Sequence, residues 1–393
     1  MQKKIIALAV AGLMSGAAFA QTNVTIYGAV DATFDNVKAN GATNGNFSDF
    51  ASRNRITANS NFIGFKGVED LGNGIKAVWQ IENGVNVDNG AAGAWNNRDS
   101  YVGLTGSYGT VVMGNITGPT RVIGAKMDVN TAATGIGADT ALLGKLGGRL
   151  GGAGAGAFDQ RITNAIAYIS PTWSGLHGAI GYSAGNTGAS GLGMREASGR
   201  DNADGLNGNT AWTAGLIYDQ GPIYVGYAYT NVGSTNHGAA GLADGLLTSV
   251  EQATSNRLAG SYNFGIAQVG LMWDHTTAAV HNGSDLKQNV WYLSGKFFVT
   301  PTGTIIGQYG HAGDVSGNGN LDEGARHWML GYEHTLSKRT MLKVGYSRIN
   351  NDNNACYDFL YGVSNANSTA GATGLMTTGT APTGWFAGMR HTF

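Results

Sequence analysis

The last ten residues of the chain have the periodicity of a β-strand and end on an aromatic side chain. Apolar residues occupy most odd positions and polar residues the even ones: Trp385, Ala387, Met389 and Phe393 against Arg390 and Thr392. Because side chains alternate across a strand, this segment has one apolar and one polar face. A strand left free at a chain end exposes unpaired backbone groups that recruit other chains. We therefore expect it to pair with the first strand and close a barrel.

The N-terminus has the pattern of a secretory signal peptide. Lys3 and Lys4 precede an apolar run over residues 5–14, and residues 18–20 (Ala-Phe-Ala) fit a small-x-small cleavage site. The run is shorter than the roughly 20 residues that a membrane-spanning helix needs. We expect cleavage after Ala20, so that residues 1–20 are the signal peptide and residues 21–393 the mature chain. A buried N-terminal helix is the alternative. Because Gln21 is not cysteine, no lipoprotein anchor is expected.

Composition favours strands and excludes several classes of protein. The 393 residues include 64 Gly but only 5 Pro, and 12% of them are charged, which suits a β-rich chain better than a helical one. The single cysteine, Cys356, allows neither an internal disulfide framework nor a thiolate metal cluster. Without Lys3 and Lys4 the chain has 24 − 2 = 22 basic and 25 acidic residues. This balance argues against nucleic acid as a partner, and no motif implies a cofactor.

Short turn signals alternate with longer polar segments along the chain. The turn signals fall at residues 70–74, 106–109, 171–175, 219–222, 263–265, 300–303 and 336–340. The clearest longer segments are residues 184–208, 231–254, 313–323 and 351–380. Outer-membrane barrels show this asymmetry, with short turns on the periplasmic side and long loops outside. Seven turns and eight loops predict about sixteen antiparallel transmembrane strands.

The segments between the turns alternate between apolar and polar side chains. In residues 290–299, for example, Trp291 and Leu293 share one face, and Tyr292 and Ser294 the other. A soluble β-sandwich also alternates, but aromatic residues near the strand ends favour the interfacial girdles of a membrane barrel. These aromatics are Tyr27, Trp79, Trp212, Tyr218, Tyr224, Trp273, Trp291 and Trp385. Sixteen strands leave a water-filled channel, so the sequence predicts a pore.

One connection is far longer than a simple barrel requires. After a strand over residues 110–115, the next strand is expected at residues 164–170, and residues 116–161 lie between them. Loops of this length without structure of their own are usually functional or disordered. Folded into a wide barrel, this one would narrow the channel, so we expect a constriction loop. An outward surface loop is the alternative.

Several motifs, in order along the mature chain, resemble the general porins of Gram-negative β-proteobacterial outer membranes, of the neisserial and Burkholderia type. They lie at residues 24–28 (Val-Thr-Ile-Tyr-Gly), 64–77 (beginning Gly-Phe-Lys-Gly), 98–104 (Arg-Asp-Ser-Tyr-Val-Gly-Leu), 164–171 (Asn-Ala-Ile-Ala-Tyr-Ile-Ser-Pro), 336–340 (Leu-Ser-Lys-Arg-Thr) and 390–393 (Arg-His-Thr-Phe). The resemblance implies a homotrimeric sixteen-stranded barrel among outer-membrane lipid and lipopolysaccharide, with the third loop folded inward. It also implies that the terminal strand, ending at Phe393, is recognised by the barrel-assembly machinery.

The function that the resemblance implies is passive diffusion of ions and small polar solutes, without enzymatic activity. A substrate-selective channel is the main alternative, and an outer-membrane enzyme of the phospholipase or protease type is a more distant one. Ion selectivity does not follow from the sequence.

The constriction of such porins sets basic wall residues against acidic residues on the inward loop. Carried over onto this chain, the wall residues are Arg98 and Arg161, and the loop acids are Asp128 and Asp139. Two arginines common in the family are missing, since Asn61-Phe62 and Gly114-Asn115-Ile116 occupy their places. The residues expected to compensate are Arg55, Arg121 and Lys126. Strict alternation with Val102 and Leu104 outward would point Asp99 rather than Arg98 into the lumen, unless a bulge reverses the order.

No other motif predicts a site of comparable strength. Residues 314–325 echo an EF-hand loop, but Ala325 stands where the bidentate Glu is needed. The histidines lack metal-binding spacing, so no metal site is expected.

Overall fold

The computed structural model describes residues 23–43, 49–89, 97–132, 135–148, 157–183, 210–233, 250–280, 283–319, 321–360, 362–363 and 378–393. The expected signal peptide lies outside these residues. Within the described part of the chain, no helix is both long and apolar enough to cross a membrane.

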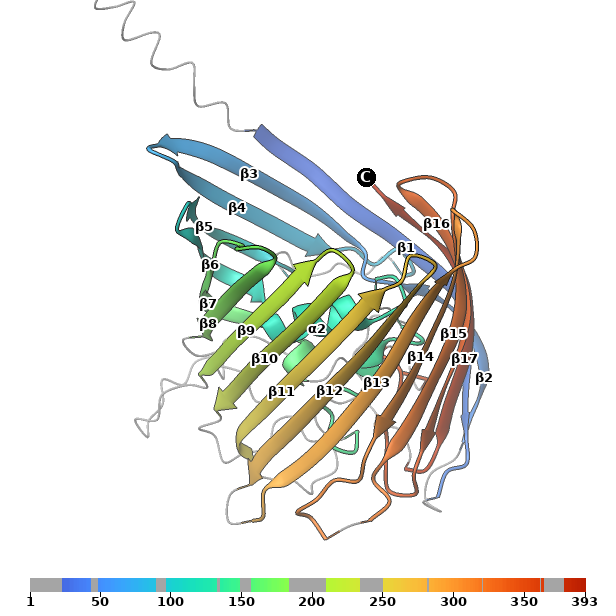
Figure 1. Cartoon of the computed structure of the whole chain (residues 1–393). Coiled ribbons are helices and arrows are strands. Elements are labelled where there is room, and N and C mark those ends of the chain that lie inside the picture. Colours follow the sequence, from blue (N-terminus) through green and yellow to red (C-terminus); the bar gives the residue numbers. More distant parts are fainter. Residues whose placement is uncertain are drawn as a thin grey trace, which may run out of the picture.

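The chain forms one closed antiparallel sheet (Figure 1). Its strand segments are β1 Asn23–Asn40, β2 Phe50–Ala58, β3 Phe62–Gly72, β4 Ile75–Gly84, β5 Ser100–Gly106, β6 Gly109–Thr117, β7 Arg161–Ile169, β8 Leu176–Ser183, β9 Ala211–Gln220, β10 Ile223–Gly233, β11 Val250–Asn263, β12 Ala267–Val280, β13 Leu286–Phe298, β14 Gly303–Ala312, β15 Ala325–Thr335, β16 Thr340–Asn351 and β17 Ala381–Thr392. Between β6 and β7, the described residues form three helices: α2 Pro119–Met127, η1 Asp139–Ala141 and η2 Ala157–Asp159.

The two ends of the chain close the barrel. Strand β17 pairs with β1 from Ala29↔Thr392 to Asn40↔Ala381, and two backbone hydrogen bonds of 3.1 Å join Gly28 to Phe393. On its other edge β1 pairs with β3 through residues 23–29 and with β2 through residues 32–39. Because β2 and β3 follow one another along the same edge, they count as one interrupted strand. The barrel therefore has the predicted sixteen strands.

The two ends of the barrel differ in the length of their connections. Seven short turns, such as the one between β3 and β4, lie at the end that holds the C-terminus, and the longer connections lie at the opposite end (Figure 1). This arrangement is the predicted one. The expected long polar segments 184–208 and most of 231–254 fall outside the described residues.

Alternation along the strands places apolar side chains on the outer surface. Trp291 and Leu293 are 46% and 53% exposed, whereas Tyr292 and Ser294 on the other face of β13 are 2% and 7% exposed. Two residues assigned from the sequence to the aromatic girdles are placed differently. Tyr27 donates its hydroxyl proton to Glu82, and Tyr224 is buried against the inner residues of the barrel. Both stand at inward positions of the strand alternation, whereas a residue of an aromatic girdle faces outward.

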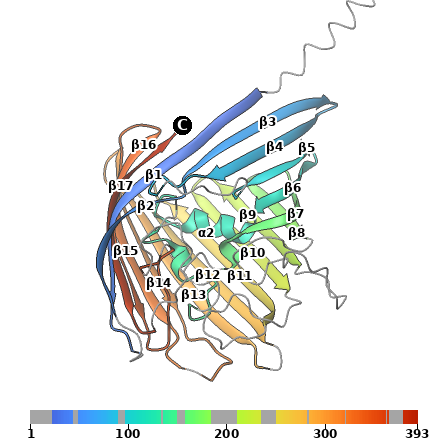
Figure 2. The same ribbon diagram turned by 180° about the vertical axis from the view of Figure 1, so that it is seen from behind.

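Helix α2 lies inside the ring of strands (Figures 1 and 2). One stripe of the helix, with residues four apart, packs against glycines on the inner faces of β9, β10 and β12, where a Cβ atom would collide with the helix. The facing pairs are Pro119–Gly215, Ile123–Gly226 and Met127–Gly270. Side chains at i and i+4 share a helix face, and the glycines let the backbone of the wall approach it closely. This packing fixes the helix against the inner wall.

The connection after β16 also folds inward. Tyr357 and Phe359 are fully buried, and the backbone N–H of Cys356 donates to the carbonyl of Gly147 at 3.0 Å. The Tyr357 hydroxyl donates to Gln288 on β13 at 2.8 Å. The segment 351–380 was expected as an external polar loop, and this expectation is wrong for its first part. The apolar side chains among residues 355–360 join a hydrophobic cluster inside the barrel.

Candidate functional site: the charged wall of the channel

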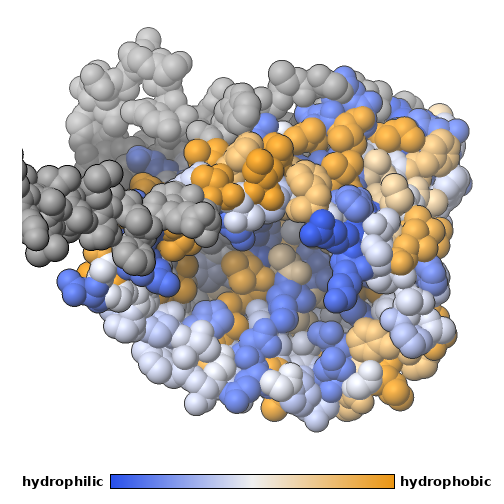
Figure 3. Space-filling model, turned by 90° about the horizontal axis from the view of Figure 1, so that it is seen from above, coloured by the Kyte–Doolittle hydropathy of each residue, from blue (hydrophilic) through white to orange (hydrophobic). Residues whose placement is uncertain are grey.

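The two halves of the inner wall differ in exposure. Inward side chains of β11 to β16 are buried beneath the two inward segments, as Ser255, Asp274, Tyr292, Gln308, Met329 and Ser347 show. On the other half, the side chains of Arg98 and Asp99 remain 19% and 21% exposed. Viewed from the end that holds the short turns, the barrel is hollow, and hydrophilic and hydrophobic residues both line the hollow (Figure 3). Water therefore reaches Arg98 and Asp99 on the wall of β4 to β8.

Arg98 lies just before β5 and pairs with a carboxylate of the neighbouring strand. Its Nε atom is 3.2 Å from Oε2 of Glu82, and its guanidinium lies 4.6 Å from the centre of the Phe62 ring. Burial lowers the pKa of Arg98 from its ordinary value, and Arg161 nearby adds to this. The pairing to Glu82, an inward residue of β4, brings Arg98 to the lumen.

Both Arg98 and Asp99 reach the lumen, and β5 contains no bulge. Asp99 follows the inward alternation of Tyr101 and lines the lumen, as strict alternation predicted. Arg98 also reaches the lumen, because it lies two residues before β5 begins at Ser100 and pairs with the inward Glu82.

Arg161 is the first residue of β7 and binds Asp99. Its Nη2 and Nε atoms lie 3.0 and 3.2 Å from Oδ2 of Asp99, while Oδ1 accepts a hydrogen bond of 2.8 Å from Thr117. The pairing of β6 with β7 shifts register between Gly114 and Ile116, and Asn164 has a φ of 50° there. This irregularity lets β7 extend to Arg161, three residues earlier than the sequence indicated.

Arg121 brings a third guanidinium to this wall from helix α2. It donates a hydrogen bond to the carbonyl oxygen of Asp159. Burial lowers the pKa of Arg121 to about 10, and the positive charges of Arg161 and Arg98 contribute to the shift. Arg121 thus lies within electrostatic reach of Arg98, Arg161 and Asp99.

Arg257 on β11 is a residue that sequence reasoning missed. It donates to both carboxylate oxygens of Asp159 at 2.6 and 2.9 Å, to the carbonyl of Thr120 at 3.0 Å, and to Asp274 at 2.8 Å. It is fully buried, and it joins both ends of the inward loop to the wall. The available signal was its inward position in β11, directly opposite Asp274 in the register. Because Asp159 is held by Arg257, its carboxylate is not part of the channel wall.

The other two basic candidates lie away from this cluster. Lys126 is 2.7 Å from Asp219 in an exposed pair and lies over the Tyr224 ring at 5.0 Å. Arg55 is buried on β2, where it is 3.5 Å from Asp35 and donates to the carbonyl of Gly362 at 2.8 Å. Neither residue is brought together with Arg98 and Arg161.

The two acidic candidates form the interior of the loop. Asp128 accepts hydrogen bonds from the backbone N–H groups of Asn130 and Asp139 at 2.8 and 2.9 Å, and both Asp128 and Asp139 are buried. Burial raises the pKa of Asp128 to about 6 and that of Asp139 well above its ordinary value, with the charge of Asp128 adding to the latter. The structure therefore places these carboxyl groups beneath the loop surface. The acids that pair with arginines of the wall are Glu82, which is itself buried, and Asp99, which is partly exposed.

The loop that resembles an EF-hand is held by its own hydrogen bonds. Oδ1 of Asp314 accepts from the backbone N–H groups of Glu323 and Gly324 at 2.9 and 3.1 Å, and Asn318 donates to Glu323 at 2.6 Å. The carboxylate oxygens of Asp314 and Glu323 thus accept hydrogen bonds from within the loop.

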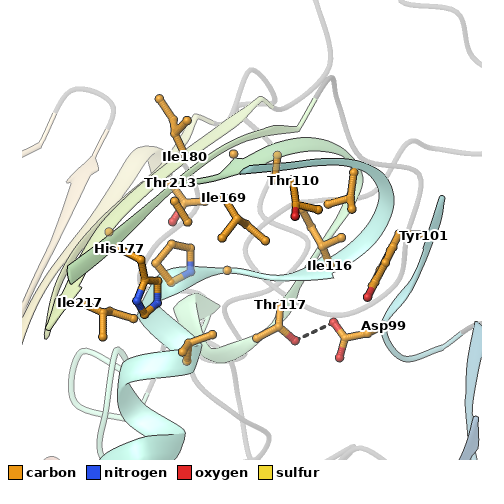
Figure 4. Close-up of a pocket in the computed structure, with 18 of the residues that line it drawn as sticks. Asp99, Tyr101, Thr110, Ile116, Thr117, Ile169, His177, Ile180, Thr213 and Ile217 are labelled. Atoms are coloured by element: carbon orange, nitrogen blue, oxygen red, sulfur yellow. Dashed lines mark hydrogen bonds between the residues drawn. The ribbon is translucent and has the colours of Figure 1, made fainter. Parts of the chain in front are cut away.

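A cavity of about 470 Å³ lies beside the charged wall, between the inner faces of β4 to β9 and the first turn of α2 (Figure 4). Asp99 and Thr117, joined by their hydrogen bond, stand at one side of it, and His177 and Ile217 at another. Its wall is mostly aliphatic, with Val112, Ile116, Ala167, Ile169, Ala179 and Ile217 among the lining residues.

A closed sixteen-stranded barrel with an apolar exterior and an exposed charged lumen is a transmembrane channel. The family model of the Gram-negative porins matches residues 7–354, and the chain belongs to this family. It is an outer-membrane porin, as the resemblance implied, and family and fold are those of channel proteins rather than enzymes.

Known relatives cover nearly the whole chain. Outer membrane porin protein 32 of Delftia acidovorans is 32% identical over 346 residues, which cover 87% of this chain and 88% of that protein. The major outer membrane protein P.IB of Neisseria gonorrhoeae is 28% identical and covers 88% and 92%.

Solved structures share the architecture. The anion-selective porin from Comamonas acidovorans has a TM-score of 0.73 at 26% identity and covers 95% of this chain and 100% of that one. At 13% identity, OmpT of Vibrio cholerae, described in a trimer form, shares the fold with a TM-score of 0.63 over 95% of this chain and 99% of its own.

Proposed function

We propose that this porin is a general diffusion channel whose constriction lies between the wall of β4 to β8 and the inward loop, residues 116–161. The observation that carries the proposal is the pairing of Arg98 with Glu82 and of Arg161 with Asp99 on the wall. Arg121 on the loop helix lies within electrostatic reach of both arginines and donates to the carbonyl of Asp159.

The charge balance of this region supports a preference for anions. Arg98 and Arg161 have carboxylate partners in Glu82 and Asp99, whereas the contact of Arg121 is to a neutral carbonyl. The carboxylate of Asp159 is engaged by Arg257. Among these three arginines and the two carboxylates that pair with them, positive charge therefore exceeds negative charge by one. The description of the Comamonas relative as anion-selective agrees with this balance.

Solutes cross by diffusion through the water of the lumen and are selected by its electric field, without tight binding. Fixed charges in a narrow region with walls of low dielectric constant produce a strong local field. Polar solutes whose dipoles align with the field cross it, and ions of the favoured sign concentrate there. Conduction requires sites that release their ions readily.

The experiment is the reversal potential of single channels in a salt gradient. Replacing Arg98, Arg121 and Arg161 with glutamine should move it toward cation preference, with the largest single effect at Arg121. A matched control is Arg339→Gln, which removes the same charge from an exposed turn. An unchanged reversal potential in the triple variant would place the constriction elsewhere.

Assembly and export follow the pattern of the family. The chain is exported through the signal peptide of residues 1–20, is recognised by the barrel-assembly machinery through Phe393, and forms a homotrimer among outer-membrane lipid and lipopolysaccharide. The apolar outer wall and the trimer form of a porin with the same fold support the trimer. Cross-linking of intact outer membranes tests it: bands no larger than a monomer would contradict a trimer.

A further inference from the structure

The cavity beside the charged wall differs from the rest of a porin lumen, which is usually polar. Aliphatic side chains from five strands and from α2 line it, including Val112, Ala167, Ala179, Ile217 and Val122. The lumen-facing positions of β6 to β9 thus carry aliphatic side chains, where polar side chains in contact with water would be expected. A pocket of this size and lining is of the kind that binds small organic molecules.

The hydroxyl groups in this wall are satisfied by the protein itself. Thr105 and Thr110 are hydrogen-bonded to each other at 2.7 Å, and Thr213 is bonded to Thr230 at 2.8 Å. Tyr101, another lining residue, donates to Gln80 at 3.2 Å. When an apolar molecule displaces the water next to a polar group, the free-energy cost is small if that group already has a hydrogen-bond partner. These groups therefore oppose an apolar ligand less than free hydroxyls would.

The charged side of the cavity determines the sign of the ligand. Asp99 lines the cavity, but its carboxylate is occupied by Arg161 and Thr117. Arg121 does not line the cavity itself, but it precedes the lining residue Val122 on α2 and lies within electrostatic reach of Asp99. Its guanidinium donates to a backbone carbonyl and retains donors for an anionic group. A carboxylate accepts the planar fork of an arginine well.

We propose that this cavity is a binding subsite for a monoanionic solute with an apolar body, such as an aryl-substituted short-chain carboxylate, with the anionic group at Arg121 and the apolar body against β6 to β9. The subsite rests on the proposed channel function, because the solute reaches it from the lumen. It gives the porin a preferred class of solute in addition to its general permeability.

The test is block of single-channel potassium chloride current in planar bilayers by three probes. 4-Phenylbutyrate has both features, butyrate has only the charge, and 4-phenylbutylammonium has the apolar body with the opposite charge. Only 4-phenylbutyrate should reduce the current saturably. Equal block by butyrate, or by the ammonium compound, would overturn the subsite.

Two matched pairs of variants locate the block. Ala179→Leu fills the cavity and should raise the apparent Kd of 4-phenylbutyrate about tenfold or more, a change of roughly 1.4 kcal/mol, whereas Ala214→Leu, at an exposed outward position of β9, should leave it unchanged. Arg121→Gln should weaken block similarly, and Arg121→Lys should retain most of it. Unchanged block in Ala179→Leu would refute the assigned position.

Failure of this subsite is distinguishable from failure of the channel function. An open, anion-preferring channel that 4-phenylbutyrate does not block would overturn the subsite alone. Absence of single-channel current from the wild-type protein would overturn both. If a variant does not insert, the three probes on the wild-type channel still decide.

Discussion

Arg257 on β11 holds Asp159 of the inward loop through two hydrogen bonds of 2.6 and 2.9 Å, and the same guanidinium also donates to the carbonyl of Thr120 at the start of helix α2. A single wall residue thus fastens both ends of the loop. Because charged hydrogen bonds between a planar guanidinium and a carboxylate are strong and directional, this contact sets how far the loop projects into the channel.

Removing Arg257 should release the loop. The variant Arg257→Ala leaves Asp159 and Asp274 as buried carboxylates without their cation, a loss of about 3–5 kcal/mol for a broken buried ion pair. We expect larger and noisier unitary conductance and faster proteolysis within residues 116–161. Arg326→Ala is the control, since Arg326 pairs with Asp352 at an exposed site. Wild-type conductance and protease resistance in Arg257→Ala would show that the loop is held by other contacts.

Gly124 should tolerate no side chain. A Cβ atom built there would lie 2.6 Å from Nη1 of Arg257 and 3.1 Å from Oδ1 of Asp159. Gly124→Ala therefore pushes the helix away from the ion pair, at a cost of about 1–3 kcal/mol. Its effect on conductance should resemble that of Arg257→Ala but be smaller. Ala125→Ser, on the exposed face of the same helix, should behave as wild type; equal effects of the two substitutions would argue against this packing.

The contact between the two inward segments should weaken as the pH rises. Asp358 is buried, and burial raises its pKa from 3.8 to about 6. The native state therefore binds this proton more tightly than the unfolded state, so its contribution to stability is complete below about pH 4 and is lost as the pH rises through about 6. Lys145, whose Nζ is 3.5 Å from the carbonyl of Asp358, has its pKa lowered by burial to about 8.

Hydrogen exchange measures this pH dependence. In wild-type protein, the protection of amides in residues 135–148 and 352–360 should fall between pH 4 and pH 6, after correction for intrinsic exchange. In Asp358→Asn this fall should be smaller. Buried Asp128, with a pKa of about 6, contributes in the same direction. A rise in protection over this range would contradict the assigned sign.

Phe393 should matter more for assembly than for stability. Its backbone closes the barrel through two hydrogen bonds to Gly28, and its side chain remains 43% exposed. Phe393→Ala keeps the backbone pairs and removes only the side chain. We expect a large fall in the amount of barrel in the outer membrane of cells but near-normal refolding into detergent micelles. Similar losses in both assays would assign Phe393 a structural role instead.

The strands of the barrel could be predicted because their signal is local. Alternation such as that of Trp291 and Tyr292 depends only on adjacent residues, and Gly or Asn marks the short turns. Arg98 and Arg161 were proposed from the resemblance to the porins, because they lie in or next to the motifs at residues 98–104 and 164–171.

The interior of the barrel could not be predicted because its contacts join distant parts of the chain. Asp128 and Asp139 have the charge expected of channel residues, but the fold of the loop buries their carboxyl groups in the interior of the loop, away from the channel. Arg257 has a partner 98 positions away, and the burial of Tyr357 depends on contacts with Gly147 and Gln288. Periodicity contains no information about such pairs.

Thiol labelling is the most direct test of an open water path along β4 to β8 beside a filled half of the lumen. In a Cys356→Ser background, Thr117→Cys lies on the open wall, and Ala312→Cys lies on the inner face of β14, where Ala312 is fully buried. A negatively charged methanethiosulfonate reagent should lower each unitary current step in Thr117→Cys and leave Ala312→Cys unaffected. Rapid block at Ala312→Cys, with no change at Thr117→Cys, would contradict the path.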